Sequence, residues 1–256
     1  MIDFNPSQFY DLIAAFFLPL TRILGIFSAA PFFGHRSIPV MVRVSFGFAL
    51  TLVVMPVLPE IRPVDPVSLD GFALMIKEFL IGIAISYCML IIFVGIEMAG
   101  EIISMTMGLG FASFFDPQTM GRNFAVSQLA TLIAILLFLG NDLHLVFLET
   151  VINSFTSLPV DKMPSGVLSL EKIQYFGKTL FEIGTHLSLP ITTIILITNL
   201  AFGVLNKAAP QLNLFSVGFP ASLLVGYISM LYILAYWDDA LLDYLSLGLK
   251  RLQDIF

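Results

Sequence analysis

The chain has 256 residues, of which 58% are hydrophobic and only 12% are charged. Soluble proteins carry about 25% charged residues, so this chain has too little charge to cover a water-facing surface. Its mean hydropathy is +0.95, and several apolar stretches approach the ~20 residues that a helix needs to cross the hydrocarbon core. The composition excludes an ordinary soluble domain and indicates an integral membrane protein.

Charge, cysteine content and motifs exclude several other classes of protein. The 12 Lys and Arg residues are outnumbered by 18 Asp and Glu residues, and the net charge of −6 supplies no basic surface for nucleic acid. The single cysteine, Cys88, excludes a disulfide framework within the chain and a multi-cysteine metal site. Zinc-protease, phosphate-loop and nucleophile-elbow motifs are absent from the sequence. We therefore expect no enzyme activity, no cofactor and no nucleic-acid partner.

Six hydrophobic segments follow one another along the chain, separated by Pro, Gly and charged residues. They are 9–33, 38–58, 72–100, 124–139, 176–205 and 214–237. Their lengths and apolar character predict membrane-associated helices, several of them broken by Pro or Gly. We expect an all-α chain that forms a single domain, 1–256.

Charged residues lie inside these apolar segments. They are Arg22, Arg43, Lys77, Glu78, Glu97 and Glu182. A charge at the bilayer centre costs about 2.5–3.5 kcal/mol, whereas each Leu, Ile, Phe or Val returns only about 0.3–0.6 kcal/mol. Intramembrane charges therefore turn toward protein or water. Two interpretations follow: the helices pack against other subunits, or the basic residues snorkel or pair with acidic residues of the same chain.

The connector, residues 101–122, is apolar but interrupted by Gly108, Gly110, Pro117 and Gly121. These residues are poor helix formers, so the pattern predicts a non-helical segment. Non-helical backbone at membrane depth is tolerated only inside protein or along an aqueous cavity. The connector is also rich in Met and Phe, which suit either a hydrophobic gate that expels water or an ordinary buried cluster that holds a loop in place.

Two later stretches are predicted not to cross a membrane. Residues 161–178 mix Lys, Glu, Ser and Pro and are expected to be solvated. Residues 238–256 predict an amphipathic helix suited to a membrane surface or a partner. Its leucines recur at helical spacing opposite charged residues, namely Leu241, Leu245, Leu249 and Leu252 against Asp239, Asp243, Lys250 and Asp254.

Three stretches contain specific sequence motifs as well as an apolar composition. Residues 30–40 read Ala-Pro-Phe-Phe-Gly-His-Arg-Ser-Ile-Pro-Val. Residues 107–117 run from Met-Gly-Leu-Gly-Phe to Phe-Phe-Asp-Pro, and residues 206–220 run from Asn-Lys-Ala-Ala-Pro to Val-Gly-Phe-Pro. Together they resemble the FliR family of flagellar export proteins, whose SctT-type relatives serve in type III secretion injectisomes. The resemblance covers essentially the whole chain.

That resemblance implies an assembly and a location. One copy would join several FliP-type and FliQ-type subunits as helical hairpins in a helical export gate, with an FlhB-type subunit wrapped around it. The gate would lie in the bacterial inner membrane, in contact with membrane lipid, at the flagellar basal body. Unfolded flagellar subunits would pass through it.

The resemblance also implies roles for particular residues. By position, the pore plug would comprise Met105, Met107, Phe111, Phe114, Phe115 and Met120, with Gly108, Gly110 and Gly121 as its pliable points. On physical grounds, independent of the resemblance, Pro210 and Pro220 would bracket a bent, extended segment. Asn206, Gln211 and Asn213 would satisfy the backbone groups that Pro210 leaves free, join a neighbouring subunit, or form a simple polar turn between two hydrophobic segments.

Two alternatives remain open at this point. One is the equivalent gate subunit of a virulence type III secretion injectisome. The other is a small-solute membrane carrier with Arg22, Arg43 and Glu97 at a central site. Carriers often contain corresponding broken segments in two related halves, and we find no convincing internal repeat of that kind.

Overall fold

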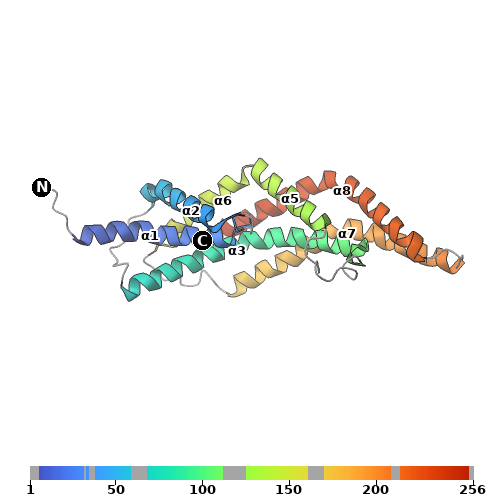
Figure 1. The fold of residues 1–256 in the computed structure, drawn as a ribbon, viewed down its shortest axis with the longest axis horizontal. Helices are drawn as coiled ribbons and strands as arrows, with labels where there is room; N and C mark the ends of the chain where they lie inside the picture. Colours follow the sequence, from blue (N-terminus) through green and yellow to red (C-terminus); the bar gives the residue numbers. More distant parts are fainter. Residues whose placement is uncertain are drawn as a thin grey trace. The chain divides into compact units, whose positions relative to one another are not determined.

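The structure is a computed structural model that describes residues 6–31, 33–34, 38–58, 68–111, 125–160, 170–208 and 214–253. Every regular element in this part of the chain is helical (Figure 1). The α-helices are α1 (Pro6–Ala29), α2 (Val40–Val54), α3 (Leu69–Thr106), α5 (Ala125–Gly140), α6 (Leu143–Ser157), α7 (Leu170–Ala208) and α8 (Leu214–Gln253), and the short 3₁₀ turns are η1 (Met55–Val57) and η2 (Leu109–Phe111).

The chain divides into two compact units. The first consists of Met1–Leu90, Asp142–Gln174 and Leu247–Phe256, and the second of Ile91–Asn141 and Tyr175–Ser246. Each has its own buried aliphatic and aromatic side chains. Examples are Ile23, Ile26, Phe27 and Ile85 in the first unit, and Ile96, Phe138, Ile183 and Ile195 in the second.

Several helices have the length and apolar character of membrane spans. Three qualify individually: Val40–Val57, Leu69–Thr106 and Gly177–Ala208. The number rises to five if two broken pairs, 125–140 with 143–157 and 218–234 with 236–253, each form one span. The prediction of an all-α, membrane-associated chain with broken segments is therefore confirmed.

Hydroxyl side chains in these helices bond to carbonyls of their own helix. The pattern includes Thr21 to Phe17, Thr51 to Gly47, Ser104 to Gly100, Thr150 to Val146, Thr185 to Phe181, Thr193 to Leu189 and Thr198 to Ile194. A hydroxyl satisfied in this way makes no demand on its surroundings. The helices can therefore face lipid or another apolar surface at these positions without stranding a polar group.

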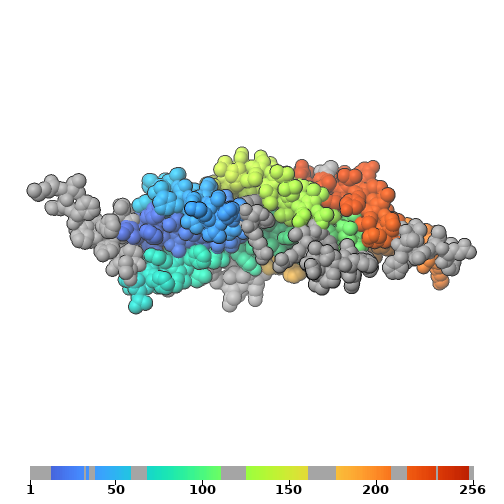
Figure 2. Space-filling model, viewed as in Figure 1, coloured from blue at the N-terminus to red at the C-terminus, as the bar shows by residue number. Residues whose placement is uncertain are grey.

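The helix α2 buries little of its surface. Its buried residues are Gly47, Thr51 and Val54, while Met41 and Val53 are among its exposed apolar side chains. It lies against α1 in Figure 1 and forms part of the visible face in Figure 2. An apolar helix exposed to this extent requires cover from lipid or from a partner.

The helix α6 lies outside the six hydrophobic segments predicted from the sequence. Polar residues dilute its apolar character, so no continuous hydrophobic run marks it. Its buried residues Phe147, Val151 and Phe155 nevertheless recur every four positions, which is the spacing of one helical face. Periodicity, rather than a continuous apolar run, was the signal for this element.

Two predicted features differ in the structure. The helix α7 begins at Leu170, inside the stretch 161–178 that we expected to be solvated and not to span. Residues 238–253 of the predicted amphipathic segment lie in the last part of α8, 236–253, which is bent by 64° from the part 218–234. Its leucines, Leu241, Leu245, Leu249 and Leu252, are buried within the protein. Their apolar face is thus already covered and is not left for a membrane surface or a partner.

Pro220 also differs from expectation. The helix α8 begins at Leu214, so Pro220 lies inside a helix and does not end an extended segment. A proline in a helix removes one backbone hydrogen bond, and α1 and α7 carry the same feature at Pro19 and Pro190. Pro210, Gln211 and Asn213 lie outside the described residues.

Glycine allows α1 and α3 to touch backbone to backbone in the first unit. A Cβ atom on Gly82 would collide with the carbonyl oxygen of Arg22, and one on Gly25 with the carbonyl oxygen of Phe79. The Ser86 hydroxyl donates a hydrogen bond of 2.6 Å to the carbonyl of Ile26 in the same contact. Small residues permit this close approach in membrane helices.

We predict that Gly82→Ala destabilises the protein by about 1–3 kcal/mol, because the added methyl group has no space. The control is Gly203→Ala on α7, where a Cβ would meet no atom within 4 Å and should give a neutral to slightly stabilising effect. Thermal unfolding of the purified variants in detergent measures the difference. Equal transition temperatures for the two variants would contradict the close contact between α1 and α3.

Candidate functional site: a buried charge cluster and the start of the connector

A buried ion pair joins α1 to α3. The side chains of Arg22 and Glu78 are both 0% exposed, and Arg22 Nε donates a hydrogen bond of 2.5 Å to Glu78 Oε2. Lys77 Nζ lies 3.2 Å from the other carboxylate oxygen, Glu78 Oε1. Two cations therefore share one carboxylate, which is itself fully buried.

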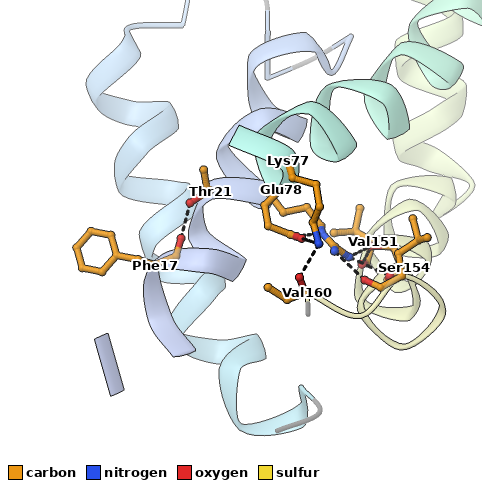
Figure 3. A network of polar contacts seen from close by, with 9 residues as sticks. Phe17, Thr21, Lys77, Glu78, Val151, Ser154 and Val160 are labelled. Carbon is orange, nitrogen blue, oxygen red and sulfur yellow. Dashed lines mark hydrogen bonds and ion pairs between the residues drawn. The ribbon is translucent and has the colours of Figure 1, made fainter. Parts of the chain in front are cut away.

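The carbonyls at the end of α6 and just after it accept the remaining hydrogen bonds. Arg22 Nη1 donates to the Ser154 carbonyl at 2.9 Å and to its hydroxyl at 3.2 Å, and Arg22 Nη2 donates to the Leu158 carbonyl at 2.8 Å. Lys77 Nζ donates to the Val160 carbonyl at 2.5 Å. Figure 3 shows Lys77 and Glu78 facing Ser154 and Val160. The last carbonyls of a helix carry partial negative charge, which offsets the excess positive charge of the cluster.

An aromatic ring completes the surroundings of Arg22. The guanidinium carbon Cζ lies 4.1 Å from the centroid of the Phe155 ring, a favourable cation–π geometry. Arg22 thus holds α1, α3 and α6 together through a carboxylate, two carbonyls, a hydroxyl and a ring. The cluster corresponds to the interpretation in which the buried charges pair within the same chain.

These contacts bear on the solute-carrier alternative. All three nitrogens of the Arg22 guanidinium bond to protein oxygens. Arg43 Nε and Nη2 donate to the Ile38 carbonyl at 3.2 and 3.0 Å, just before α2. Both arginines thus direct these donors at the protein itself, and no observation favours a solute site built on them.

The helix α3 ends at Thr106, two residues before a glycine of the connector. The Met107 amide donates to the Ile103 carbonyl at 2.9 Å, and the Gly108 amide donates to the Met105 carbonyl at 3.0 Å. Gly108 has φ of 87°, a left-handed conformation that glycine adopts without strain and that commonly ends helices. The predicted break is present, but it begins at Met107: residues 101–106 are helical, in contrast to the expectation for the whole connector.

The expected plug residues differ in their surroundings. Met105 is 61% exposed, whereas Met107 is 0% exposed. A Cβ on Gly110 would meet no atom within 4 Å, and Phe111 ends η2. Phe114, Phe115, Met120 and Gly121 lie outside the described residues. Glu97, in the second unit, is an exposed residue of α3.

The connector links two antiparallel helices. The Phe93 and Phe138 rings lie edge to face with their centroids 5.8 Å apart. A Cβ on Gly100 would collide with Cα of Ser127. As the residue number rises along α3 it falls along α5, so the two helices form a hairpin.

In the described part of the chain, no three or more His, Cys, Asp or Glu side chains gather as a metal site would require.

Comparison with known proteins identifies the family. Residues 13–247 match the family described as bacterial export proteins, family 1. The flagellar biosynthetic protein FliR of Pectobacterium carotovorum subsp. carotovorum is 39% identical over 231 residues, which cover 90% of this chain and 88% of that protein. The chain belongs to the FliR family of bacterial export proteins.

Other FliR proteins match over a similar extent. That of Escherichia coli (strain K12) is 34% identical over 88% of this chain and 86% of its own length. That of Bacillus subtilis (strain 168) is 27% identical over 97% of both chains. FliR-family membership, first suggested by the three sequence stretches, is therefore confirmed.

Sequence reasoning missed part of the charge cluster. It identified Arg22, Lys77 and Glu78, but not Ser154, Phe155 or the carbonyls of Leu158 and Val160. Backbone carbonyls leave no residue-specific signal in a sequence. The Ser154 hydroxyl and the Phe155 ring are far from Arg22 in sequence, and only the fold brings them to it.

We predict that Glu78→Gln lowers the free energy of unfolding by about 3–5 kcal/mol, because it leaves two cations without their shared carboxylate. The matched control is Glu182→Gln. It breaks the exposed Lys178–Glu182 pair, whose atoms lie 3.1 Å apart, and should cost only about 0.3–0.5 kcal/mol. Unfolding of both variants in detergent tests the difference. A Glu78→Gln variant as stable as the control would rule out a structural role for the cluster.

Proposed function

We propose that the chain is a structural, pore-forming subunit of the flagellar type III export gate, with the connector closing the pore at rest. FliR-family membership indicates a subunit of the flagellar export apparatus with membrane-embedded helices. We further propose that this subunit lines part of a pore and closes it, which is a structural role and not a catalytic one. It rests on the place and composition of the connector.

The observation that carries this proposal is a long link between two closely packed antiparallel helices. The helix α3 ends at Thr106 and α5 begins at Ala125. Helix–helix connections in bundles usually need only about 2–8 residues. The span from 107 to 124 exceeds what the hairpin geometry requires, which supports a separate role for it.

The composition of the connector suits a closure that must also yield to a passing chain. Met and Phe side chains form a constriction that excludes water, and therefore ions, without a fixed charge. The unbranched Met side chain adapts its shape to a moving body. Gly108 and Gly110 give the backbone freedom to rearrange near the end of α3.

The apolar surface of the described helices supports association with partner subunits. Exposed apolar side chains occur along α2, α7 and α8, for example at Met41, Leu200 and Leu231. Surfaces of this kind need lipid or protein cover. We propose that FliP-type, FliQ-type and FlhB-type subunits supply part of it in the bacterial inner membrane, at the flagellar basal body, while unfolded flagellar subunits are the cargo.

We predict that Gly110→Asp makes the assembled gate conduct small ions at rest, because a charge in an apolar constriction admits water. A Cβ at Gly110 meets no atom of the described residues within 4 Å, so a leak would not reflect a steric clash with them. The control is Gly140→Asp at the end of α5, where a Cβ also meets no atom within 4 Å. Planar-bilayer recordings of the purified gate measure the current. Equal currents from wild type and Gly110→Asp would argue against closure by the connector.

A second prediction concerns partners. Affinity purification of the tagged chain in mild detergent should recover FliP-type and FliQ-type subunits in fixed proportion, because exposed apolar helices need protein cover. Mass spectrometry of the purified material identifies them. Recovery of a stable, monodisperse chain without these subunits would contradict the proposed gate and revive the carrier alternative.

A further inference from the structure

We propose that Met107, seated against Gly226 of α8, is the positioning residue that fixes where the connector leaves α3. This inference rests on the proposed function, since it assigns the contact that holds the closing segment in place. It concerns two residues of the second unit that are far apart in sequence.

The contact involves the outer atoms of the Met107 side chain. A Cβ placed on Gly226 would stand 2.6 Å from Cγ, 2.7 Å from Cε and 2.9 Å from Sδ of Met107. The thioether therefore lies across the surface that the missing side chain of Gly226 leaves open. Met107 is fully buried there.

Space, rather than backbone conformation, explains glycine at position 226. Gly226 lies well inside α8, where glycine costs about 1 kcal/mol relative to alanine. Among the described glycines only Gly108 has a positive φ, so conformational freedom does not account for Gly226. The contact with Met107 does account for it.

Met107 is a fully buried residue directly before the point where the backbone changes direction. Its amide donates a backbone hydrogen bond to the Ile103 carbonyl four residues earlier, and the next residue, Gly108, takes the left-handed conformation. Met105, two residues earlier, is largely exposed. The buried thioether is thus the side chain that ties the end of α3 to α8 at the start of the connector.

A second contact secures the opposite side of the same hairpin. Gly100 of α3 packs directly on the backbone of Ser127 in α5. The end of α3 is thereby held by α5 through backbone contact and by α8 through Met107. Of the two contacts, the one through Met107 lies directly before Gly108, where the backbone turns, and it depends on a flexible side chain. It is therefore the contact through which a substitution can displace the closing segment.

The test measures resting ion conductance of the complete assembled gate in planar bilayers. Gly226→Leu fills the space of the thioether and should raise resting conductance by about 5- to 150-fold, the range expected when overpacking shifts a closed–open equilibrium. Gly203→Leu is the matched control, because a Cβ at Gly203 meets no atom within 4 Å; it should conduct like wild type. Met107→Ala removes the anchor without adding bulk and should also leak.

The double variant Met107→Ala with Gly226→Leu provides the decisive comparison. The leucine should fill the space that the shortened side chain vacates, so conductance should return toward the wild-type level. Co-purification of the partner subunits establishes assembly for every variant, and Met107→Ala tests the anchor if Gly226→Leu fails to assemble. A leak in Gly226→Leu that the double variant does not reduce would overturn the anchor.

A deletion of residues 109–115 separates failure of the anchor from failure of the proposed function. If the deletion leaks while Gly226→Leu and Met107→Ala both stay closed, the connector closes the pore but Met107 does not position it. If the deletion itself stays closed, the proposed closure fails, and the anchor role fails with it.

Discussion

The burial of Arg22 is the constraint on which the first unit depends. A guanidinium removed from water is tolerated only when its charge and its donors all find partners. Here the partners come from two places in the chain: Glu78 on α3, and the end of α6 with its carbonyls and the ring of Phe155. Displacing any one of these elements would leave the buried guanidinium without a partner. The cluster therefore makes α1, α3 and α6 structurally interdependent.

The second unit relies on close packing at glycine. Gly95 approaches Ile183, Gly184 approaches Met98, and Gly226 approaches Met107, so that α3 is fitted to α7 and α8 through small residues opposite larger ones. Membrane helices associate through such packing because lipid provides no hydrophobic drive between them. The helix α3 contributes to both units. Its first half is held by the charge cluster as well as by glycine packing against α1, and its second half by glycine packing.

These two constraints give the proposed export function a physical basis. A segment that closes a pore must be movable, but its ends must be fixed. The start of the connector combines both properties, with Gly108 in a left-handed conformation directly after the fully buried Met107. The hydroxyl groups that bond to their own helices, and the apolar side chains exposed on α2, α7 and α8, suit helices that are covered by lipid or by other subunits.

The sequence by itself determined the membrane character, the helical class, most of the helices and the family, because apolar run length and short motifs are local properties. It also marked Arg22, Lys77 and Glu78 as costly charges that need partners. It did not reveal α6, whose apolar residues are periodic rather than continuous. The partners of Arg22, the burial of the α8 leucines and the seat of Met107 against Gly226 were decided only by the tertiary structure. The carbonyl partners of Arg22 and the space beside Gly226 are brought together from distant parts of the chain and leave no local pattern in the order of residues. The helical spacing of the leucines is a local pattern, but it does not show what covers them.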